Sequence, residues 1–402
     1  MQTSSSNPTS STAYPILFAI CIAHFLNDLL QIILQTSFPM FKEEYSLSYA
    51  QIGMITLIFQ MTSSILQPFV GNYTDKHPMP YSFMIGMTFT LFGVIYLSFA
   101  DNYTSILISA GLIGIGSSIF HPEASKLAFY AAGGRRGLAQ SIFQIGGNGG
   151  RAVGPLLMTA IVISHGQRYI SVFAIFALAG IILLYFIGKW YMNYLVHNKR
   201  KLKKAMSMEL FLPKNKLRKS FIVLLVIIFS KYFYVSSITS YLHLYLIEKF
   251  DFSIGKSQSY LFAYLFAVAL GTLIGGPIGD KIGRKYVIWI SVLGVAPFTM
   301  LLPYADPFWS LVLLIIIGII LASAFPAIIV YAQELLPGRT GMVSGFFYGF
   351  AFGMGGIGAA FLGKLADNIG LINVFYWCSF LPLLGLFAIY LPNLKKYQNL
   401  TN

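Results

Sequence analysis

The stretch GPIGDKIGRK, at residues 276–285, has a degenerate copy 205 residues earlier, GNYTDKHPMP, at residues 71–80. A second pair of segments, 137–155 and 341–359, aligns at nearly the same offset and keeps its glycines in register. Matches at one spacing indicate an internal repeat rather than chance similarity. The shared residues of the first pair are Gly71 with Gly276, Asp75 with Asp280, and Lys76 with Lys281.

The composition places this repeat in a membrane. Of 402 residues, 56% are hydrophobic and only 10% are charged, which is too little charge to cover a water-soluble protein of this size. Most of the apolar runs reach the ~20 residues that a spanning helix needs. We expect an all-α membrane protein with twelve transmembrane helices in two six-helix pseudo-symmetric bundles. The predicted spans are 15–41, 48–70, 80–100, 104–130, 138–163, 169–196, 220–247, 257–279, 286–302, 307–332, 341–363 and 370–392.

These spans predict the organisation of the chain. The two bundles occupy residues 15–196 and 220–392, and a basic cytoplasmic linker at 197–219 joins them. Residues 1–14 are expected to form a disordered N-terminal tail, and 393–402 a C-terminal tail.

The excess of positive charge indicates the topology. The chain has 27 Lys and Arg against 13 Asp and Glu, a formal net charge of +14. Nineteen of the 27 lie in even-numbered connections or in the C-terminal tail, ten of them between residues 189 and 219. By the positive-inside rule, both termini are then cytoplasmic, as in a multi-pass protein of a bacterial inner membrane. The charge is therefore a topology signal, and no nucleic-acid partner is expected.

The sequence lacks the motifs of the common enzyme classes. It has no GxSxG string, no GxxxxGK[ST] string and no metal-binding box. The two cysteines, Cys21 and Cys378, lie within spans and are expected to be small packing residues. We therefore expect no enzymatic activity, no cofactor, no metal site and no direct use of ATP.

The repeated motif resembles the signature of the major facilitator superfamily, a family of transporters. GPIGDKIGRK is similar to the signature between spans 8 and 9, and GNYTDKHPMP to that between spans 2 and 3, although Pro78 and Met79 replace its glycine and arginine. The resemblance implies that the motif braces one conformation of an alternating-access cycle. The residues of this conformational motif are Gly71, Asp75, Lys76, Gly276, Asp280, Lys281, Gly283, Arg284 and Lys285.

A glycine ladder in span 5 resembles the motif typical of the antiporters in that superfamily. Gly146, Gly150 and Gly154 stand four residues apart, and Pro155 follows them. Small residues at this spacing form a groove in which a second helix backbone can approach closely. Tight packing alone and a direct role in setting the exchange mode are both open interpretations. Arg151 departs from the pattern, because a small residue is expected there.

Several further strings resemble the fosmidomycin resistance branch of the superfamily, over about residues 14–392. The resemblance implies proton-driven export of fosmidomycin, a small phosphonate antibiotic. The strings are HFLNDLLQ in span 1, QIGMITLIFQ and SSILQPFVGNYTDKHPMP around span 2, GSSIFHPEASK in span 4, GGRRGLAQSIFQIGGN in span 5, FSKYFY in span 7 and YAQELLPGR after span 10.

Span 1 carries a polar stripe. His24, Asp28, Gln31 and Gln35 are spaced 4, 3 and 4 residues apart, so they share one face of a helix. A charge near the middle of a span costs between ~2.5 and ~17 kcal/mol unless it meets a partner or water. We therefore expect this face to meet water or protein, and the rest of the helix to meet lipid.

Span 4 adds two further groups that can exchange protons, His121 and Glu123. In the fold that the resemblance implies, spans 1, 4, 7 and 10 line the cavity. A carboxylate whose surroundings change during the cycle can take up and release a proton. Our hypothesis is that Asp28 or Glu123 carries the coupled proton, with His24 and His121 as further candidates.

Two cations within spans are candidates for attracting an anionic substrate. Arg151 lies near the centre of span 5 and Lys231 near the centre of span 7. A phosphonate dianion can bind the planar fork of arginine or the point charge of lysine. The further candidates for substrate binding are Gln31, Gln60, Gln144, Tyr232 and Tyr234.

The same residues also fit purely structural roles. The alternatives are an ion pair of Asp28 with Lys231 or Arg151, an i,i+3 pair of Glu123 with Lys126, a hydrogen bond of His121 to backbone freed by Pro122, a contact of Arg151 with Gln144 or Asn148, and polar packing between helices for the glutamines.

The expected function is that of a proton-coupled antiporter that exports a small anionic compound by alternating access. Its expected partners are that compound, protons and the lipid bilayer, and the protein is expected to act as a monomer. An uptake or exchange carrier for organic anions or sugar phosphates is the first alternative. A sensor or scaffold that has a transporter fold without transport is the second.

Overall fold

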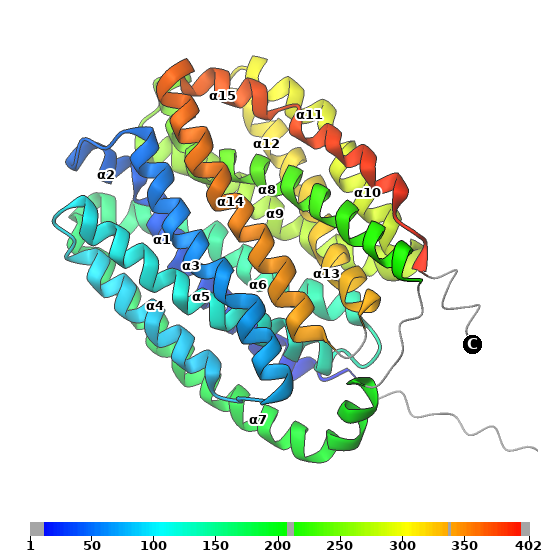
Figure 1. Ribbon diagram of the computed structural model, residues 1–402. Coiled ribbons are helices and arrows are strands. Elements are labelled where there is room, and N and C mark those ends of the chain that lie inside the picture. Colours follow the sequence, from blue (N-terminus) through cyan, green and yellow to red (C-terminus); the bar gives the residue numbers. More distant parts are fainter. Residues whose placement is uncertain (1–11, 207–212, 337–338, 395–402) are drawn as a thin grey trace, which may run out of the picture.

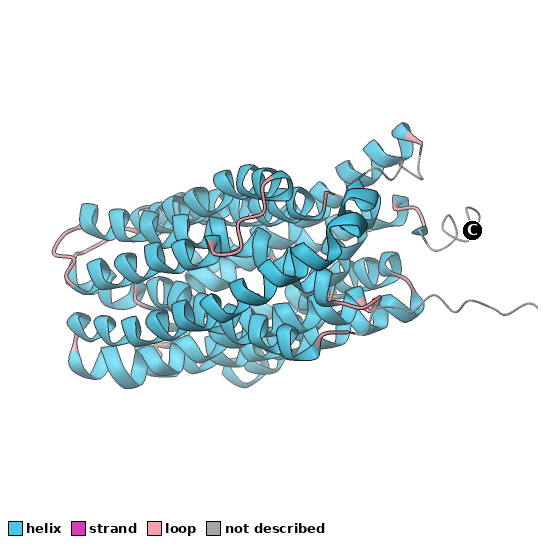
Figure 2. Cartoon of the chain, turned by 90° about the horizontal axis from the view of Figure 1, so that it is seen from below, coloured by secondary structure: helices cyan, strands magenta, loops and turns pink. Residues whose placement is uncertain are grey.

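The computed structural model describes residues 12–206, 213–336 and 339–394, and in these residues the chain forms helices and loops without a strand. Figure 2 shows this all-helical composition. In Figure 1 the helices of the first half, blue to green, gather on one side of the molecule, and those of the second half, green to red, on the other. Most of the predicted N-terminal tail, residues 207–212 of the predicted linker and residues 395–402 lie outside the described residues.

The first half contains six spanning units. Its helices are α1 (Tyr14–Thr36), α2 (Phe38–Glu44), α3 (Tyr49–Lys76), α4 (Ser82–Ser98), α5 (Tyr103–Ala131), α6 (Arg136–Leu157), η1 (Met158–Ile163), η2 (Gln167–Phe173) and α7 (Ala174–Met206). α1 and α2 together form the first unit, η1 extends α6 beyond Pro155, and η2 leads into α7.

The second half repeats this arrangement. Its helices are α8 (Lys214–Phe250), α9 (Ile254–Ile282), α10 (Arg284–Gly294), α11 (Ala296–Leu301), η3 (Leu302–Tyr304), α12 (Pro307–Ala322), α13 (Ala324–Leu335), α14 (Thr340–Ile369), α15 (Leu371–Cys378) and η4 (Leu381–Tyr390).

The helices account for the predicted spans. In the described part of the chain, ten helices or runs of helices are long and apolar enough to cross a membrane. The shorter apolar helix α4 and the glycine-rich α6 with η1 occupy the two remaining predicted spans. The predicted all-α fold class with twelve spanning helices in two halves is confirmed.

Polar N-cap residues stabilise the starts of several helices at one end of the bundle. Ser48 accepts a hydrogen bond from the backbone N–H of Gln51, and Asn102 accepts one from that of Ser105. In both cases the side chain of the later residue bonds back to the cap, which completes a capping box. We call the other end, which carries Lys76 and Lys281, the basic end.

The glycine ladder brings α6 onto α1 within the first half. A Cβ atom at Gly146 would collide with the Cys21 carbonyl, and one at Gly150 with the Phe25 carbonyl. The two helix backbones therefore touch, as expected for small residues four positions apart. This contact supports the packing interpretation and leaves a direct role in exchange untested.

The two halves meet along two helix pairs, α3 with α14 and α6 with α9. Figure 1 shows α3 and α14 side by side. At the basic end, Asp75 on α3 accepts a hydrogen bond from the backbone N–H of Met342 on α14, with an N···O distance of 2.9 Å. In the same way Asp280 on α9 accepts one from Leu138 on α6, at 3.2 Å. Each repeated aspartate thus lies at the N-terminus of a helix in the other half, where the helix dipole favours negative charge.

A third aspartate makes the matching contact at the opposite end. Asp367 on α14 accepts hydrogen bonds from the backbone N–H groups of Tyr49 and Ala50 at the start of α3, at 3.2 and 3.0 Å. Gln258 on α9 also donates to the carbonyl oxygen of Thr36 on α1, at 3.1 Å. Hydrogen bonds therefore join the two halves at both ends of the bundle.

The ladder contact predicts a difference between two adjacent glycines. Replacing Gly150 with alanine should destabilise the protein by about 1–3 kcal/mol, because the new methyl group would overlap the α1 backbone. The matched control is Gly149→Ala, whose Cβ would lie 3.5 Å from the Phe25 ring, an ordinary contact distance. Thermal unfolding of the purified variants in detergent measures the difference. Equal midpoints for the two variants would show that the helices are not in backbone contact.

Candidate functional site

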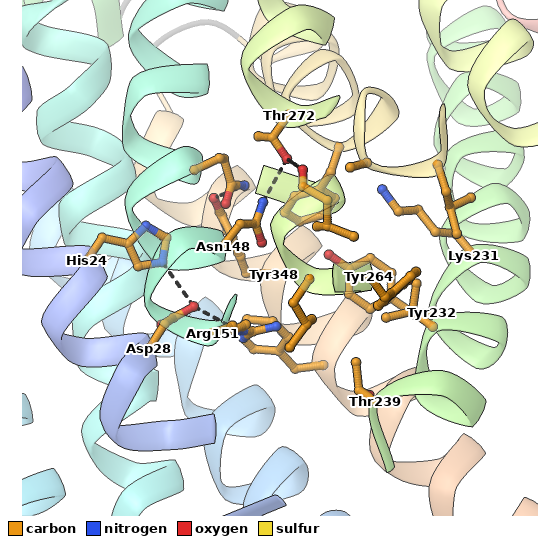
Figure 3. A pocket seen from close by; sticks show the side chains of 18 of the residues that line it. His24, Asp28, Asn148, Arg151, Lys231, Tyr232, Thr239, Tyr264, Thr272 and Tyr348 are labelled. Carbon is orange, nitrogen blue, oxygen red and sulfur yellow. Dashed lines mark hydrogen bonds and ion pairs between the residues drawn. The ribbon is translucent and has the colours of Figure 1, made fainter. Parts of the chain in front are cut away.

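A cavity of about 70 Å³ lies between the two halves. Helices α1, α5 and α6 line it from the first half, and α8, α9, α12, α13 and α14 from the second. Figure 3 shows the polar side chains that point into it. The polar and ionisable residues of the lining are His24, Asp28, His121, Gln144, Asn148, Arg151, Lys231, Tyr232, Thr239, Tyr264, Thr272 and Tyr348.

A second, smaller cavity of about 30 Å³ adjoins the first. Gln31, Gln35 and Gln60 line this space. Arg151 and Tyr232 belong to the linings of both cavities, so they lie where the two spaces meet.

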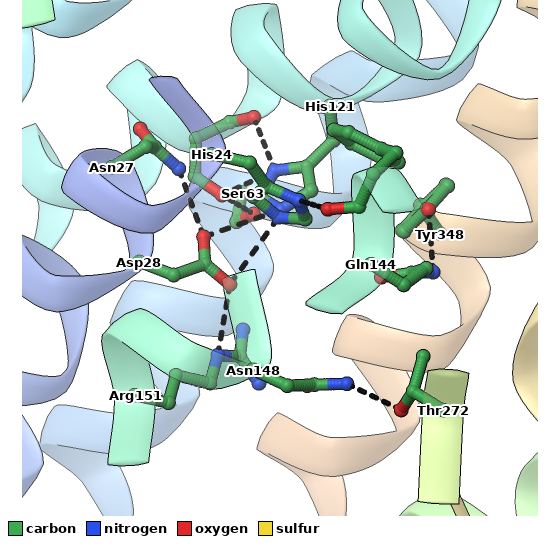
Figure 4. A network of polar contacts seen from close by, with 12 residues as sticks. His24, Asn27, Asp28, Ser63, His121, Gln144, Asn148, Arg151, Thr272 and Tyr348 are labelled. Atoms are coloured by element: carbon green, nitrogen blue, oxygen red, sulfur yellow. Dashed lines mark hydrogen bonds and ion pairs between the residues drawn. The ribbon is translucent and has the colours of Figure 1, made fainter. Parts of the chain in front are cut away.

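The Asp28 carboxylate is the centre of the polar contacts on the first-half wall, as Figure 4 shows. It is 3% exposed, yet four side chains surround it. Its Oδ2 atom lies 3.0 Å from Nε of Arg151 and 3.4 Å from Nε2 of His24. Its Oδ1 atom lies 3.5 Å from Nε2 of His121 and accepts a hydrogen bond from the Asn27 amide at 3.0 Å. A charge this deep in an apolar bundle needs such partners, because unpaired burial is costly.

The two imidazoles present the same ring atom to Asp28. His24 Nδ1 lies 2.8 Å from the carbonyl oxygen of Phe143, and His121 Nδ1 lies 3.1 Å from that of Ser117. The Phe143 carbonyl only accepts hydrogen bonds, so Nδ1 of His24 carries a proton, whereas Nδ1 of His121 can also accept a hydrogen bond from the Ser117 hydroxyl at 3.1 Å. In a neutral His24 ring the Nε2 lone pair would then face the carboxylate, which is repulsive. The arrangement is satisfied when a proton lies between an imidazole and Asp28.

Among the described residues, His24, Asp28 and His121 form the group of side chains that could hold a metal ion. Their candidate donor atoms lie within 4.8 Å of one another, and histidines held by a backbone carbonyl are common metal ligands. The Arg151 guanidinium, at 3.0 Å from one of these oxygen atoms, opposes a second positive charge there. Protons therefore fit this cluster better than a divalent cation.

Lys231 lies on the opposite wall of the cavity from Asp28, as Figure 3 shows. Its side chain is buried, and its ammonium group lies 5.3 Å from the centre of the Phe325 ring and 5.9 Å from that of Tyr232. No carboxylate pairs with it among the described residues. Ring faces partly stabilise a cation, but they do not neutralise it.

Most of the predicted site residues come together, and two do not. His24, Asp28, His121, Gln144, Arg151, Lys231 and Tyr232 line the larger cavity, and Gln31 and Gln60 the smaller one. Glu123 lies elsewhere, where it pairs with Lys126 at 2.6 Å and accepts a hydrogen bond from Thr74. Tyr234 is buried outside both linings.

The structure also distinguishes between the structural alternatives. Asp28 pairs with Arg151 and not with Lys231. Arg151 does not bond Gln144 or Asn148, whose amides donate instead across the seam between the halves. The acceptor of Gln144 is Tyr348, and that of Asn148 is Thr272, both at 2.7 Å.

Three further residues of the site were not predicted from the sequence, namely Tyr348, Thr272 and Gly147. The repeat alignment contained a signal for the first of these, because it places Tyr348 opposite Gln144, its hydrogen-bond partner. A Cβ at Gly147 would collide with His24 and Asp28, so this glycine leaves the space that their side chains occupy. It lies beside the ladder but not in its register, and the spacing therefore gave no sign of it.

Comparisons with known proteins agree with this architecture. The family model described as "Major Facilitator Superfamily" matches residues 20–360. The chain is 54% identical over 388 residues to the "Fosmidomycin resistance protein" of Escherichia coli (strain K12), covering 96% of this chain and 95% of that protein. It is 41% identical over 395 residues to the "Uncharacterized MFS-type transporter YfnC" of Bacillus subtilis (strain 168), with the same coverage.

A solved structure shows the same fold at low sequence identity. The chain superimposes on FucP, a transporter of this superfamily in its outward conformation, with a TM-score of 0.69 and 15% identity, over 95% of this chain and 100% of that one. The family model spans most of the chain, and the E. coli relative aligns along nearly its whole length. This chain is therefore a multi-pass membrane transporter that belongs to the major facilitator superfamily.

Proposed function

We propose that this chain is a proton-coupled antiporter of a bacterial inner membrane that exports a small anionic compound by alternating access, with both termini cytoplasmic. The observation that carries the proposal is the separation of charge across one cavity. Asp28 and two imidazoles lie on one wall, and Lys231 lies on the other without an acidic partner among the described residues. The name of the 54% identical relative, "Fosmidomycin resistance protein", supports a phosphonate as the exported compound.

Lys231, on the wall of the cavity opposite Asp28, accounts for the selection of an anionic substrate. A buried ammonium group without a counter-ion leaves a local positive potential, which a phosphonate or carboxylate group would neutralise. Lys231 offers this charge on the C-terminal half, and Arg151 can add a fork of donors from the N-terminal half. A bound anion would then hold the two halves together.

Antiport requires that the proton and the substrate exclude each other. A substrate whose anionic group binds Lys231 and whose hydroxyl group donates to Asp28 meets this requirement, because a proton on Asp28 removes the acceptor. The walls of the cavity place these two anchors opposite each other. Release on the acidic side of the membrane would then accompany protonation of Asp28.

The ion pair between Asp28 and Arg151 favours a second candidate function, an uptake carrier for organic anions. If protonation of Asp28 freed Arg151, the cavity would gain a cation and bind an anion more tightly. Proton and substrate would then move together rather than in exchange. The two candidates predict opposite effects of pH on substrate binding.

The first prediction of this proposal concerns the pH dependence of substrate binding. For the antiporter, binding of fosmidomycin to the purified protein should weaken as pH falls from ~8 to ~5, because a proton on Asp28 would remove the acceptor of the substrate's hydroxyl group. Isothermal titration calorimetry measures the binding. Asp28→Asn is the control, because the ionisation of fosmidomycin itself affects binding to both proteins equally. The binding affinity of this variant should depend less on pH than that of the wild type. Tighter binding in acid that Asp28→Asn abolishes would favour the uptake carrier instead.

The second prediction concerns the unpaired lysine. Lys231→Gln should weaken fosmidomycin binding roughly ten- to hundredfold, because a hydrogen bond to a charged group is worth about 1.5–3 kcal/mol. Lys256→Gln removes an equal charge from an exposed position at the far end of the bundle and should bind normally. Unchanged affinity in Lys231→Gln would exclude this wall as the anion site.

The third prediction separates the two candidate proton carriers. In everted membrane vesicles, Asp28→Asn should abolish accumulation of labelled fosmidomycin driven by a pH gradient, whereas Glu123→Gln should retain a response to the gradient. The reason is that Asp28 lines the cavity and Glu123 is paired outside it. Loss in Glu123→Gln alone would transfer the role to that residue. The wild type and both variants are compared at equal expression. Accumulation that does not respond to the pH gradient in any of the three would contradict proton coupling. The absence of any flux in all three would favour the sensor or scaffold.

A further inference from the structure

An apolar groove of about 400 Å³ lies on the surface of the bundle at the basic end, apart from the central cavity. α3 of the first half forms one wall, and α8 and α14 of the second half form the other. Phe69 is 69% exposed and Phe346 is 38% exposed in this lining, so the groove opens toward the surroundings of the bundle. Within a membrane those surroundings are lipid.

Positive charge surrounds the basic end of this groove. Lys76 follows the groove residue Asn72 by one helical turn on α3, and Arg218 precedes Phe221 by one turn on α8. Arg339 lies at the N-cap of α14, one turn before Met342 and Val343 of the lining. All three cations are exposed, and none of them has an ion-pair partner among the described residues. Three helices thus each contribute one cation at the basic end of the same apolar groove.

We propose that this groove binds one anionic phospholipid, with an acyl chain along the aromatic walls and the phosphate at Lys76, Arg218 and Arg339. The chemistry of the two parts matches, because basic pockets between spanning helices bind the head groups of anionic lipids. A zwitterionic lipid carries its own cation beside the phosphate and would therefore bind more weakly. The proposal is independent of the transported substrate, because no residue of the central cavity takes part in it.

The position of the groove gives the lipid a structural consequence. Met342 lines the groove, and its backbone N–H is the donor to Asp75 that joins the two halves. A lipid that contacts both α3 and α14 would therefore stabilise the closed arrangement of the basic end. The expected effect is a more stable protein when the lipid is bound, since a ligand specific for the folded state raises its stability.

The test uses the purified full-length protein in a neutral detergent and measures its thermal unfolding midpoint. Added phosphatidylglycerol should raise the midpoint saturably, whereas phosphatidylcholine and inorganic phosphate should not. The double variant Arg218→Gln/Arg339→Gln should lose most of this rise. The matched control, Lys189→Gln/Lys256→Gln, removes two exposed charges elsewhere and should keep the rise.

A second variant tests the groove itself. Asn72→Trp places a ring at an exposed groove position and should abolish the rise with little change in the midpoint without lipid, since it leaves all three cations in place. A full rise in Asn72→Trp, a full rise in the double arginine variant, an equal loss in the lysine control, or an equal rise with inorganic phosphate would each overturn the proposal.

Discussion

The buried Asp28 carboxylate is the constraint on which the first half depends. It can remain charged in an apolar bundle only while Arg151 and the imidazoles of His24 and His121 stay within reach, and these side chains come from three helices. α6 reaches α1 closely enough because Gly146 and Gly150 let the backbones touch, and Gly147 leaves the volume that the histidine and the aspartate fill. The packing of α1 against α6 and the geometry of the ionisable site therefore depend on each other, because a shift of either helix would move the side chains around Asp28.

The contacts between the halves have a different character. Asp75 and Asp280 lie at helix N-termini of the opposite half at one end, and Asp367 does the same at the other end. Interactions of a carboxylate with a helix N-terminus are individually modest, typically ~0.3–1 kcal/mol near the surface. Such contacts can define a closed state without preventing its opening. α3 and α14 run in opposite directions, so each helix supplies an aspartate near its C-terminus to the N-terminus of the other.

The sequence was sufficient for the elements and for part of the site, and the reason lies in what spacing encodes. Apolar length predicts spans, and the repeat predicts two halves, because both can be read along the chain without knowing which helices are neighbours. Spacing also predicts a helix face, and His121 and Glu123, two residues apart, point to opposite sides of α5. The resemblance placed both near the cavity, but only His121 lines it, while Glu123 meets Lys126 and Thr74. The sequence left the partner of Arg151 open between Asp28, Gln144 and Asn148, because the reach of a long side chain depends on which helices are neighbours.

The size of the cavity indicates how this arrangement relates to a transport cycle. A space of about 70 Å³ can hold several water molecules, whereas sites for drug-sized ligands are typically ~300–1,000 Å³. On the proposed function, the halves would have to separate before a phosphonate occupied the space between Asp28 and Lys231. In the structure the Asp28 carboxylate is paired with Arg151 and the two imidazoles, and Lys231 lies against aromatic rings. A substrate that replaces these internal contacts on entry would thus bind by exchanging partners rather than by filling a preformed site, which couples its binding to the movement of the halves.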